Sequence, residues 1–194
     1  MSHYFINDTN IKNNKRKTEA SIREHKFVFW VDNGVFSKKG LDFGTRTLLE
    51  NLPLNKMNGE ILDFGCGYGP IGIVIAKLSE AKVDMLDVND RALDLAKQNV
   101  IENDVEVNII KSDIYGSVTK KYDYIISNPP IRVGKEILYK ILFGAKEYLK
   151  DNGQLWIVVN KDQGAKSLAK ELEHIYKVQI ICRNKGFFVI CASK

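Results

Sequence analysis

The stretch of sequence that decides the fold is residues 63–70, Asp-Phe-Gly-Cys-Gly-Tyr-Gly-Pro. Its first residue ends a short strand pattern at residues 60–63, and it leads into a helical pattern at residues 70–79, so it predicts a strand, a tight loop and a helix. Three alternate glycines let the backbone bend sharply and bring a ligand against main-chain atoms that a Cβ would shield. The loop is typical of a site for a nucleotide-type cofactor.

Acidic residues at strand ends indicate which cofactor the loop holds. Residues 67–72 also satisfy G-x-G-x-x-G, so a dinucleotide site is an alternative, but that motif alone is weak. Asp63 ends its strand beside the loop, and a carboxylate there suits a positive sulfonium and ammonium better than a pyrophosphate. Asp87 ends the next strand about twenty residues past the glycines, where it can accept both hydroxyl protons of a ribose. We therefore expect S-adenosylmethionine.

A third acidic residue follows the next predicted strand. Asp113 can accept a hydrogen bond from the adenine amine, and the side chain of Ile114 can pack on the adenine ring. Loops at the ends of a rigid sheet commonly carry such binding residues.

Short apolar runs alternate with longer helical periods from residue 60 onward. The predicted strands are residues 60–63, 82–87, 105–111, 122–126, 154–159, 178–182 and 187–191, and the predicted helices are residues 70–79, 90–103, 134–149 and 163–175. Strands separated by helices indicate a parallel sheet covered on both faces. Only residues 183–186 separate the last two strands, too few for a crossover, so these strands should pair antiparallel. We predict a Rossmann-like α/β fold with a mostly parallel seven-stranded sheet.

The N-terminal region has a different character. Residues 1–25 are polar and show no sustained apolar period, so we expect an arm, with regular structure beginning after it. Residues 26–31 are aromatic and β-branched, and turn residues 32–34 predict a hairpin with residues 35–36. A short helix is predicted over residues 45–51. The chain is thus divided into a basic polar arm, residues 1–25, and one domain, residues 26–194.

Composition limits the function further. The 194 residues are 44% hydrophobic, enough for one sizeable core. No apolar run approaches the roughly 20 residues that span a bilayer, and the N-terminus lacks a signal peptide's apolar stretch, so we expect a cytoplasmic protein without a membrane partner. The three cysteines, Cys66, Cys182 and Cys191, lack metal-ligand spacing, so we expect reduced thiols and no metal.

Positive charge is partly concentrated near the N-terminus. The net charge is +5, and Lys12, Lys15, Arg16 and Lys17 place four cations in six positions. Arg132, Lys135, Arg183 and Lys185 add to this charge. A solvated surface is one interpretation, and a polyanionic partner such as RNA is the other.

Asn128, Pro129 and Pro130 follow the predicted strand at residues 122–126. The two prolines fix the backbone and remove two main-chain donors, which leaves the Asn128 amide oxygen and the Pro129 carbonyl as preset acceptors. Acceptors on both hydrogens of a planar amine favour the pyramidal geometry in which its lone pair points at a methyl donor. Positioning then does most of the catalytic work, without a covalent intermediate. A rigid turn alone is the simpler alternative.

These motifs together resemble those of class I amino-methyltransferases. Residues 33–37 and 41–45 further resemble the element before the catalytic domain in the ribosomal RNA small-subunit methyltransferase C family, which methylates guanine on its exocyclic amine. The similarity runs from about Phe27 to the C-terminus. The resemblance implies that residues 26–52 help to close the cofactor pocket, and that Asn128 and the Pro129 carbonyl lie at the target amine.

The predicted site residues fall into three groups. The predicted catalytic residues are Asn128, Pro129 and Pro130. Those predicted to bind the cofactor are Phe36, Thr45, Asp63, Gly65, Cys66, Gly67, Gly69, Pro70, Asp87, Val88, Asp113, Ile114 and Asn128. Those predicted to bind the substrate are Lys15, Arg16, Lys17, Ile131 and Arg132.

Two features depart from the family pattern. The family usually has an aromatic residue after the second proline, to stack on the flipped base, where this chain has Ile131 followed by Arg132. We also expect the chain to be without the extra N-terminal domain of longer members, because it resembles the short, single-domain branch.

Several functions stay open at this point. Guanine N2 of ribosomal RNA is the first candidate target, and an adenine or cytosine amine in RNA or DNA is a close variant. Asn-Pro-Pro elements also serve in methylation of a glutamine side chain in translation factors. A non-catalytic binding module and a nicotinamide-dependent enzyme are disfavoured, the first by intact acidic and Asn-Pro-Pro motifs and the second by Asp63.

Overall fold

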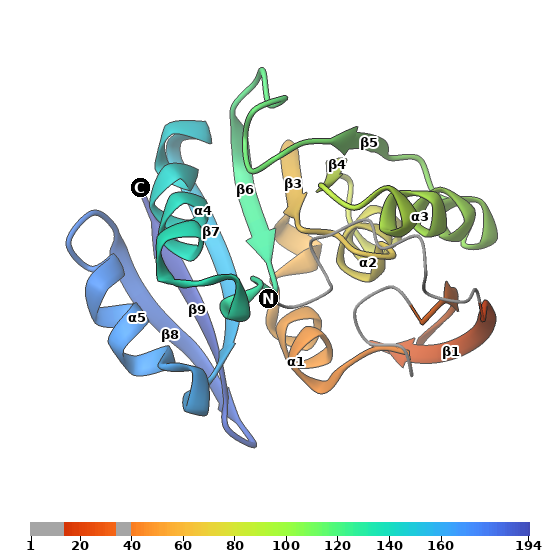
Figure 1. Cartoon of the computed structure of the whole chain (residues 1–194), viewed down its shortest axis with the longest axis horizontal. Helices are drawn as coiled ribbons and strands as arrows, with labels where there is room; N and C mark the ends of the chain where they lie inside the picture. Colours follow the sequence, from red (N-terminus) through yellow and green to blue (C-terminus); the bar gives the residue numbers. More distant parts are fainter. Residues whose placement is uncertain (1–13, 34–39) are drawn as a thin grey trace.

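A computed structural model of the chain describes residues 14–33 and 40–194. Its centre is a seven-stranded sheet in the order β5-β4-β3-β6-β7-β9-β8 (Figure 1). The strands are β3 (Glu60–Phe64), β4 (Lys82–Asp87), β5 (Asn108–Lys111), β6 (Tyr122–Ser127), β7 (Leu149–Asn160), β8 (Lys177–Asn184) and β9 (Phe187–Ser193). Strands β3 to β7 are parallel, whereas β9 lies antiparallel between β7 and β8. The predicted Rossmann-like sheet with an antiparallel C-terminal hairpin is confirmed.

Helices cover both faces of this sheet. They are α1 (Phe43–Asn51), α2 (Pro70–Leu78), α3 (Asp90–Glu102), α4 (Lys135–Tyr148) and α5 (Ala165–Leu172). Buried residues of α1, α2 and α3 share one hydrophobic cluster with one face of the sheet, and α4 and α5 share a second cluster with the other. The apolar run of β7 is continuous because the strand is buried on both faces. Trp156 and Val158 belong to the first cluster, and Leu155 and Ile157 belong to the second.

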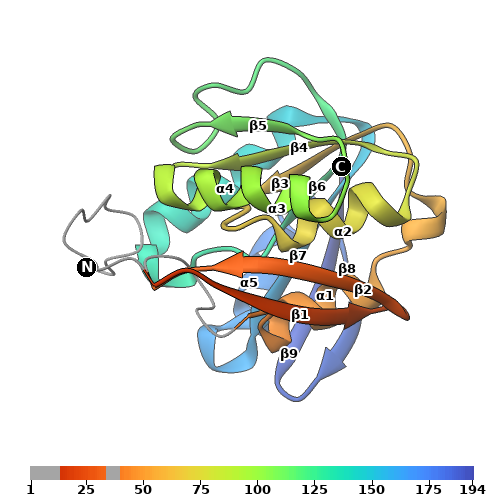
Figure 2. The ribbon, with the colours of Figure 1, turned by 90° about the vertical axis from the view of Figure 1, so that its right-hand side faces the viewer.

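A hairpin of β1 (Arg16–Ile22) and β2 (His25–Val31) precedes the sheet and crosses the molecule beside α3 (Figure 2). The expectation that regular structure begins after residue 25 is therefore wrong, because β2 pairs with the chain before it. The expected partner at residues 35–36 lies outside the described residues. Whether residues 1–25 act as a separate arm stays a prediction.

The turn of this hairpin explains why β1 was not predicted. Ile22 pairs with His25, so the loop is only Arg23 and Glu24, with left-handed φ values of 48° and 67°. Such two-residue turns normally use Asn and Gly, and these side chains carry no such signal. Arg23 is held by α1 instead: its guanidinium donates to the Glu50 carbonyl at 3.0 Å and also to the Leu52 carbonyl. These bonds satisfy carbonyls at the end of α1 and help to stabilise the turn.

Two asparagines of α3 hold β2 by its backbone. The Asn99 amide accepts from Trp30 N at 2.6 Å and donates to Trp30 O at 3.0 Å, and Asn103 does the same with Val28 at 3.1 and 2.8 Å. Residues four apart on a helix are separated by about 6 Å along its axis, close to the spacing of two strand residues. Asn99 also donates to the Tyr68 carbonyl at 2.8 Å. It therefore joins the hairpin to the glycine loop.

We expect Asn99→Ala to lower the free energy of unfolding by about 3 kcal/mol, because two backbone groups of Trp30 and the Tyr68 carbonyl lose their partner. Urea denaturation measures the loss. Gln98→Ala is the matched control, since Gln98 is the exposed neighbour on the same helix. A loss below about 1 kcal/mol would mean that water replaces the amide without cost.

Other element bounds differ at their ends. Helix α5 begins only at Ala165, because Lys161–Gln163 form a 3-10 turn and Gly164 (φ 82°) has a left-handed backbone between the two. Strand β5 begins at Asn108 rather than at residue 105. Strand β7 begins at Leu149, before the predicted residue 154. None of these differences moves a predicted site residue.

Candidate active site

The glycine loop leaves β3 and is tied to the end of β4. The backbone N–H groups of Gly65 and Cys66 both donate to the Leu86 carbonyl, at 2.8 and 2.9 Å. Gly65 and Gly67 have left-handed φ values of 71° and 57°, and a Cβ built on either would meet nothing within 4 Å. The loop thus presents bare backbone to open space, as a site for a flat or extended ligand requires.

The later glycines serve the packing of α2. A Cβ on Gly72 would lie 2.5 Å from Met85 Sδ, and one on Gly69 would lie 2.9 Å from Met85 Cε. Helix α2 therefore sits close against β4. Gly69 caps α2 with a left-handed backbone and Pro70 is its first residue. The contribution of Gly69 and Pro70 to cofactor binding stays a prediction, and their observed contacts are structural.

Asp63 lies beneath the loop and is 0% exposed. Its Oδ2 accepts from Gly72 N at 2.8 Å, whereas Oδ1 is buried without a partner among the described residues. Burial raises the pKa of this carboxyl to about 7, the Gly72 bond lowers the pKa, and the nearby Asp87 raises it again. An unpaired buried carboxylate is costly, and a cation bound against the loop would offset that cost. The site thus fits a positively charged ligand.

Asp87 ends β4 and shapes the other side of the loop. Its Oδ2 accepts from Gly67 N at 2.8 Å and its Oδ1 from Asn89 N at 2.9 Å. Burial raises the pKa of Asp87, and these backbone bonds lower it. The cap of α3 is Asn89, whose side chain accepts from Ala92 N at 3.2 Å. Asp87 therefore does not cap the helix, and its carboxylate retains lone pairs for ribose hydroxyls.

The segment after β5 adjoins Asp87. Ser112 N donates to the Asp87 carbonyl at 3.1 Å, so Asp113 follows at the same edge of the sheet. The Asp113 side chain is exposed, and Ile114 is half-buried with a left-handed φ of 49°. Their position agrees with an adenine site, and the predicted contacts of Asp113, Ile114 and Val88 stay predictions.

Asn128 follows β6 and lies half-buried against the start of α1. Its Nδ2 donates to Thr45 Oγ1 at 3.0 Å and to Asp42 Oδ1 at 3.4 Å. Ser127 Oγ donates to the Phe64 carbonyl at 2.8 Å, which joins the ends of β6 and β3. The glycine loop and Asn128 therefore lie at the same side of the sheet, where the carboxyl ends of the neighbouring strands β3 and β6 meet.

The residues after Asn128 form a short turn. Pro129 is buried, and Pro130 precedes the 3-10 turn Ile131–Val133. Ile131 packs against the cluster formed with α4 and α5. The Arg132 side chain lies outside the part that the structure describes, so its predicted role in stacking or phosphate binding stays a prediction, as does that of Ile131.

The basic residues near the N-terminus lie on the hairpin. Arg16 begins β1 opposite Val31, and Lys15 precedes it with an exposed side chain. Lys17 pairs with Glu102 Oε1 at 2.8 Å and lies over the Trp30 ring. Phe36, a predicted cofactor-binding residue, and Lys12, part of the predicted basic cluster, lie outside the described residues. The substrate roles of these residues stay predictions.

Sequence reasoning missed Asp42. Its Oδ1 accepts from Thr45 N at 3.0 Å and so caps α1, besides contacting Asn128. The signal was present, because an Asp three residues before Thr45 at a helix start is typical of an N-cap. Tyr68 was also missed: its buried hydroxyl has no partner within the described residues. Burial raises its pKa, and the charge of Asp42 raises it further.

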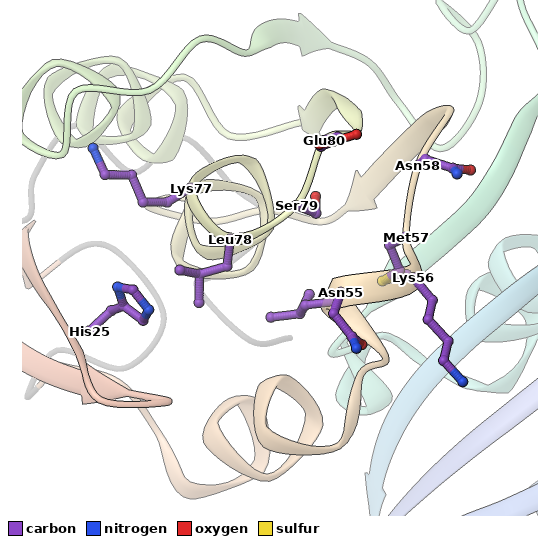
Figure 3. Close-up of a pocket in the computed structure, with 10 residues that line it drawn as sticks. His25, Asn55, Lys56, Met57, Asn58, Lys77, Leu78, Ser79 and Glu80 are labelled. Atoms are coloured by element: carbon purple, nitrogen blue, oxygen red, sulfur yellow. The ribbon is translucent and has the colours of Figure 1, made fainter.

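A pocket at the opposite, amino ends of the strands has no part in this site (Figure 3). It is lined by residues 54–58, which precede β3, by residues 77–80, which precede β4, and by His25. Ligands of open α/β sheets bind at the carboxyl ends of the strands, and this pocket lies at the amino ends.

A cationic nucleoside fits the acidic, glycine-lined carboxyl ends of β3 and β4. When bound, S-adenosylmethionine supplies an electrophilic methyl group at this edge. The backbone of Gly65 and Gly67, with Asp63 and Asp87, would hold the cofactor. The protein is therefore of the class of Rossmann-like methyltransferases that depend on S-adenosylmethionine.

Comparison with known families agrees with this class. The family model of the methyltransferase small domain matches residues 26–191, and the chain belongs to this family. It is 39% identical to the uncharacterized protein YbxB of Bacillus subtilis, over 99% of this chain and 98% of that protein. It is 33% identical to ribosomal RNA small subunit methyltransferase C of Haemophilus influenzae, over 92% of this chain and 54% of that protein.

Among solved structures, the fold resembles the T. thermophilus 16S rRNA N2 G1207 methyltransferase in complex with AdoMet and guanosine. The TM-score is 0.84 at 23% identity, over 93% of this chain and 50% of that one. The chain thus spans about half the length of the named methyltransferases that it matches. No helix in the described part of the chain is long and apolar enough to cross a membrane.

We expect the affinity for S-adenosylmethionine to rise with pH from about 5.5 to about 7.5, because a cationic ligand favours the ionised form of Asp63 and binding then releases its proton. The carboxyl has a pKa of about 7 in the folded chain against an ordinary 3.8. Between these values the folded state binds more protons than the unfolded state, so the Asp63 contribution to stability falls as pH rises. Calorimetry in buffers of different ionisation enthalpy measures the released proton. In Asp63→Asn the release should disappear, and an unchanged release would contradict the assignment.

We expect Asp87→Ala to weaken S-adenosylmethionine binding about five- to a hundredfold, because buried hydroxyls lose their acceptor. Gly67 N loses its partner as well. Asp94→Ala, an exposed carboxylate on α3, is the control for charge. Unchanged affinity in calorimetry would mean that the cofactor lies elsewhere.

Proposed function

We propose that the protein methylates an exocyclic amine of an RNA base, with guanine N2 in ribosomal RNA as the first candidate. The observation that carries this proposal is the held amide of Asn128, whose NH₂ group is bonded to Thr45 and Asp42. Its Oδ1 is therefore left for a substrate. A substrate that donates a hydrogen to this oxygen carries an N–H or O–H group, and only an NH₂ group can also donate its second hydrogen to the Pro129 carbonyl.

The chain's own residues account for activation of such an amine. The Asn128 Oδ1 and the Pro129 carbonyl accept one hydrogen each, and these bonds favour a pyramidal nitrogen with its lone pair exposed. Because both acceptors sit on a proline-fixed backbone, they need little reorganisation when charge develops on the nitrogen. Pro129 is buried, so packing around it holds the segment in place.

A cation and two aromatic rings at the start of α1, the helix that contacts Asn128, support a nucleic-acid substrate. Lys185, in the turn between β8 and β9, lies 5.3 Å from the Phe43 ring centroid, and Phe43 is 36% exposed at the start of α1. Phe187 packs against Phe43 at 5.8 Å. An exposed ring with a cation beside it suits a base and its phosphate. Phe43 also offers an aromatic surface in a chain that has Ile131 where the family usually has a stacking ring.

The names of the relatives favour RNA among the alternatives. The Haemophilus relative is a ribosomal RNA methyltransferase, and the T. thermophilus structure holds guanosine. Adenine or cytosine amines and the glutamine amide of a translation factor present the same NH₂ group, so they stay candidate substrates. An enzyme with a ribosomal substrate would act in the cytoplasm, which is the location predicted from the sequence.

The proposal is tested by transfer of tritium from labelled S-adenosylmethionine to total RNA, DNA or protein, followed by nucleoside analysis. We expect label in ribosomal RNA, as N2-methylguanosine. Label in adenosine or cytidine would mean that the target base is not guanine, while the reaction remains methylation of an exocyclic amine. Label in protein alone would overturn the proposal.

In the same assay we expect Asn128→Ala to lower the single-turnover rate about a hundredfold, with little change in either KM, because the amide contact strengthens toward the transition state. Asn128→Asp should also lose most activity while it keeps cofactor binding, since a carboxylate has no NH₂ to donate to Asp42. Rates within about threefold of the parent for both variants would leave Asn-Pro-Pro as a structural turn.

A further inference from the structure

We propose that Asp42 and Thr45 are positioning residues that set which way the Asn128 amide faces, an inference that rests on the proposed function. A primary amide has one donor side and one acceptor side of nearly the same shape. If it rotates by half a turn, it presents NH₂ groups to an incoming amine and can no longer activate it. The catalytic role of Asn128 therefore requires a device that fixes its orientation.

Asp42 determines which of the two amide orientations is favoured. Its Oδ1 lies 3.4 Å from Asn128 Nδ2, and an ionised carboxylate only accepts hydrogen bonds. With the amide reversed, two oxygen acceptors would face each other, which is unfavourable. Thr45 cannot make this distinction, because a hydroxyl donates to an oxygen as readily as it accepts from a nitrogen. Thr45 Oγ1, at 3.0 Å from Nδ2, instead fixes where the amide lies.

The start of α1 makes a rigid base for both contacts. Asp42 Oδ1 accepts from Thr45 N at 3.0 Å, so the cap bond joins the two positioning residues directly. Thr45 is 2% exposed and lies in the first turn of α1, so its backbone is held in the helical conformation. A Cβ on Gly44 would lie 2.8 Å from Phe187, so the first turn of α1 packs closely on β9. Neither residue can move away from Asn128 without disturbing this packing.

Thr45 was predicted from the sequence to contact the cofactor, whereas a positioning residue acts on Asn128. A cofactor contact would show in the dissociation constant of S-adenosylmethionine. A positioning role would show in the rate of methyl transfer and only when Asn128 is present. The two roles are thus separable by experiment.

We expect Thr45→Val and Asp42→Asn each to lower the single-turnover rate about tenfold, the effect of one hydrogen bond. Calorimetry should give an unchanged dissociation constant for S-adenosylmethionine. Asp42→Asn keeps a good N-cap, so α1 should stay folded. Thr45→Ser should restore most of the rate lost in Thr45→Val. The matched control is Thr47→Val, because Thr47 is also 2% exposed in α1 but its hydroxyl donates to the Phe43 carbonyl of its own helix.

The decisive measurement is a double-mutant cycle with Asn128→Ala. If Thr45 acts through the amide, Thr45→Val should change the residual rate of Asn128→Ala less than about twofold. Equal losses in both backgrounds would overturn the inference and leave the proposed function intact. Label in protein alone, in the acceptor assay described above, would instead overturn the proposed function.

A readout without methyl transfer completes the test. The side-chain NH₂ resonances of Asn128, identified by their disappearance in Asn128→Ala, should exchange slowly with solvent in the parent. They should exchange faster in Thr45→Val and remain slow in Thr47→Val. Fast exchange in the parent would show that the amide is not held and would overturn the inference.

Discussion

The hydrogen bond from Gly72 N to Asp63 Oδ2 is the interaction on which the site depends. It joins the end of β3 to the second residue past the start of α2, so it fixes how the chain turns between them. The turn is tight only because Gly72 has no side chain to strike Met85. The cost is a buried carboxylate whose second oxygen has no partner among the described residues. The same bond that closes the fold thus creates a need for positive charge at the loop.

The central sheet was predictable because its signals are local. The apolar runs of β3 and β4 and the glycine loop between them fix strand, turn and helix within 28 residues, from Glu60 to Asp87. The antiparallel order of β8 and β9 follows from the shortness of their connection. Asp63, Asp87 and Asn128 could be predicted as site residues for the same reason, since each lies at the end of a strand that its own sequence reveals.

The hairpin and the support of Asn128 were less predictable because they depend on contacts between distant segments. Strand β1 has few apolar residues, and its turn lacks the usual turn residues. It is stabilised by pairing with β2 and by the bonds from Arg23, in the turn, to carbonyls at the end of α1. The bond between Thr45 and Asn128 spans 83 positions in the sequence. No local pattern encodes such a pairing, although the capping pattern at Asp42 did mark the place where α1 begins.

The hold of Asn99 and Asn103 on β2 has a consequence for where the folding unit begins. One edge of β2 is satisfied by side chains of α3 and the other by the backbone of β1. The family match starts at residue 26, inside β2. A fragment cut at that boundary would expose a bare strand edge with alternating apolar residues, which is a template for aggregation. The boundary of the family is thus a poor guide to the smallest piece of this chain that can be produced in soluble form.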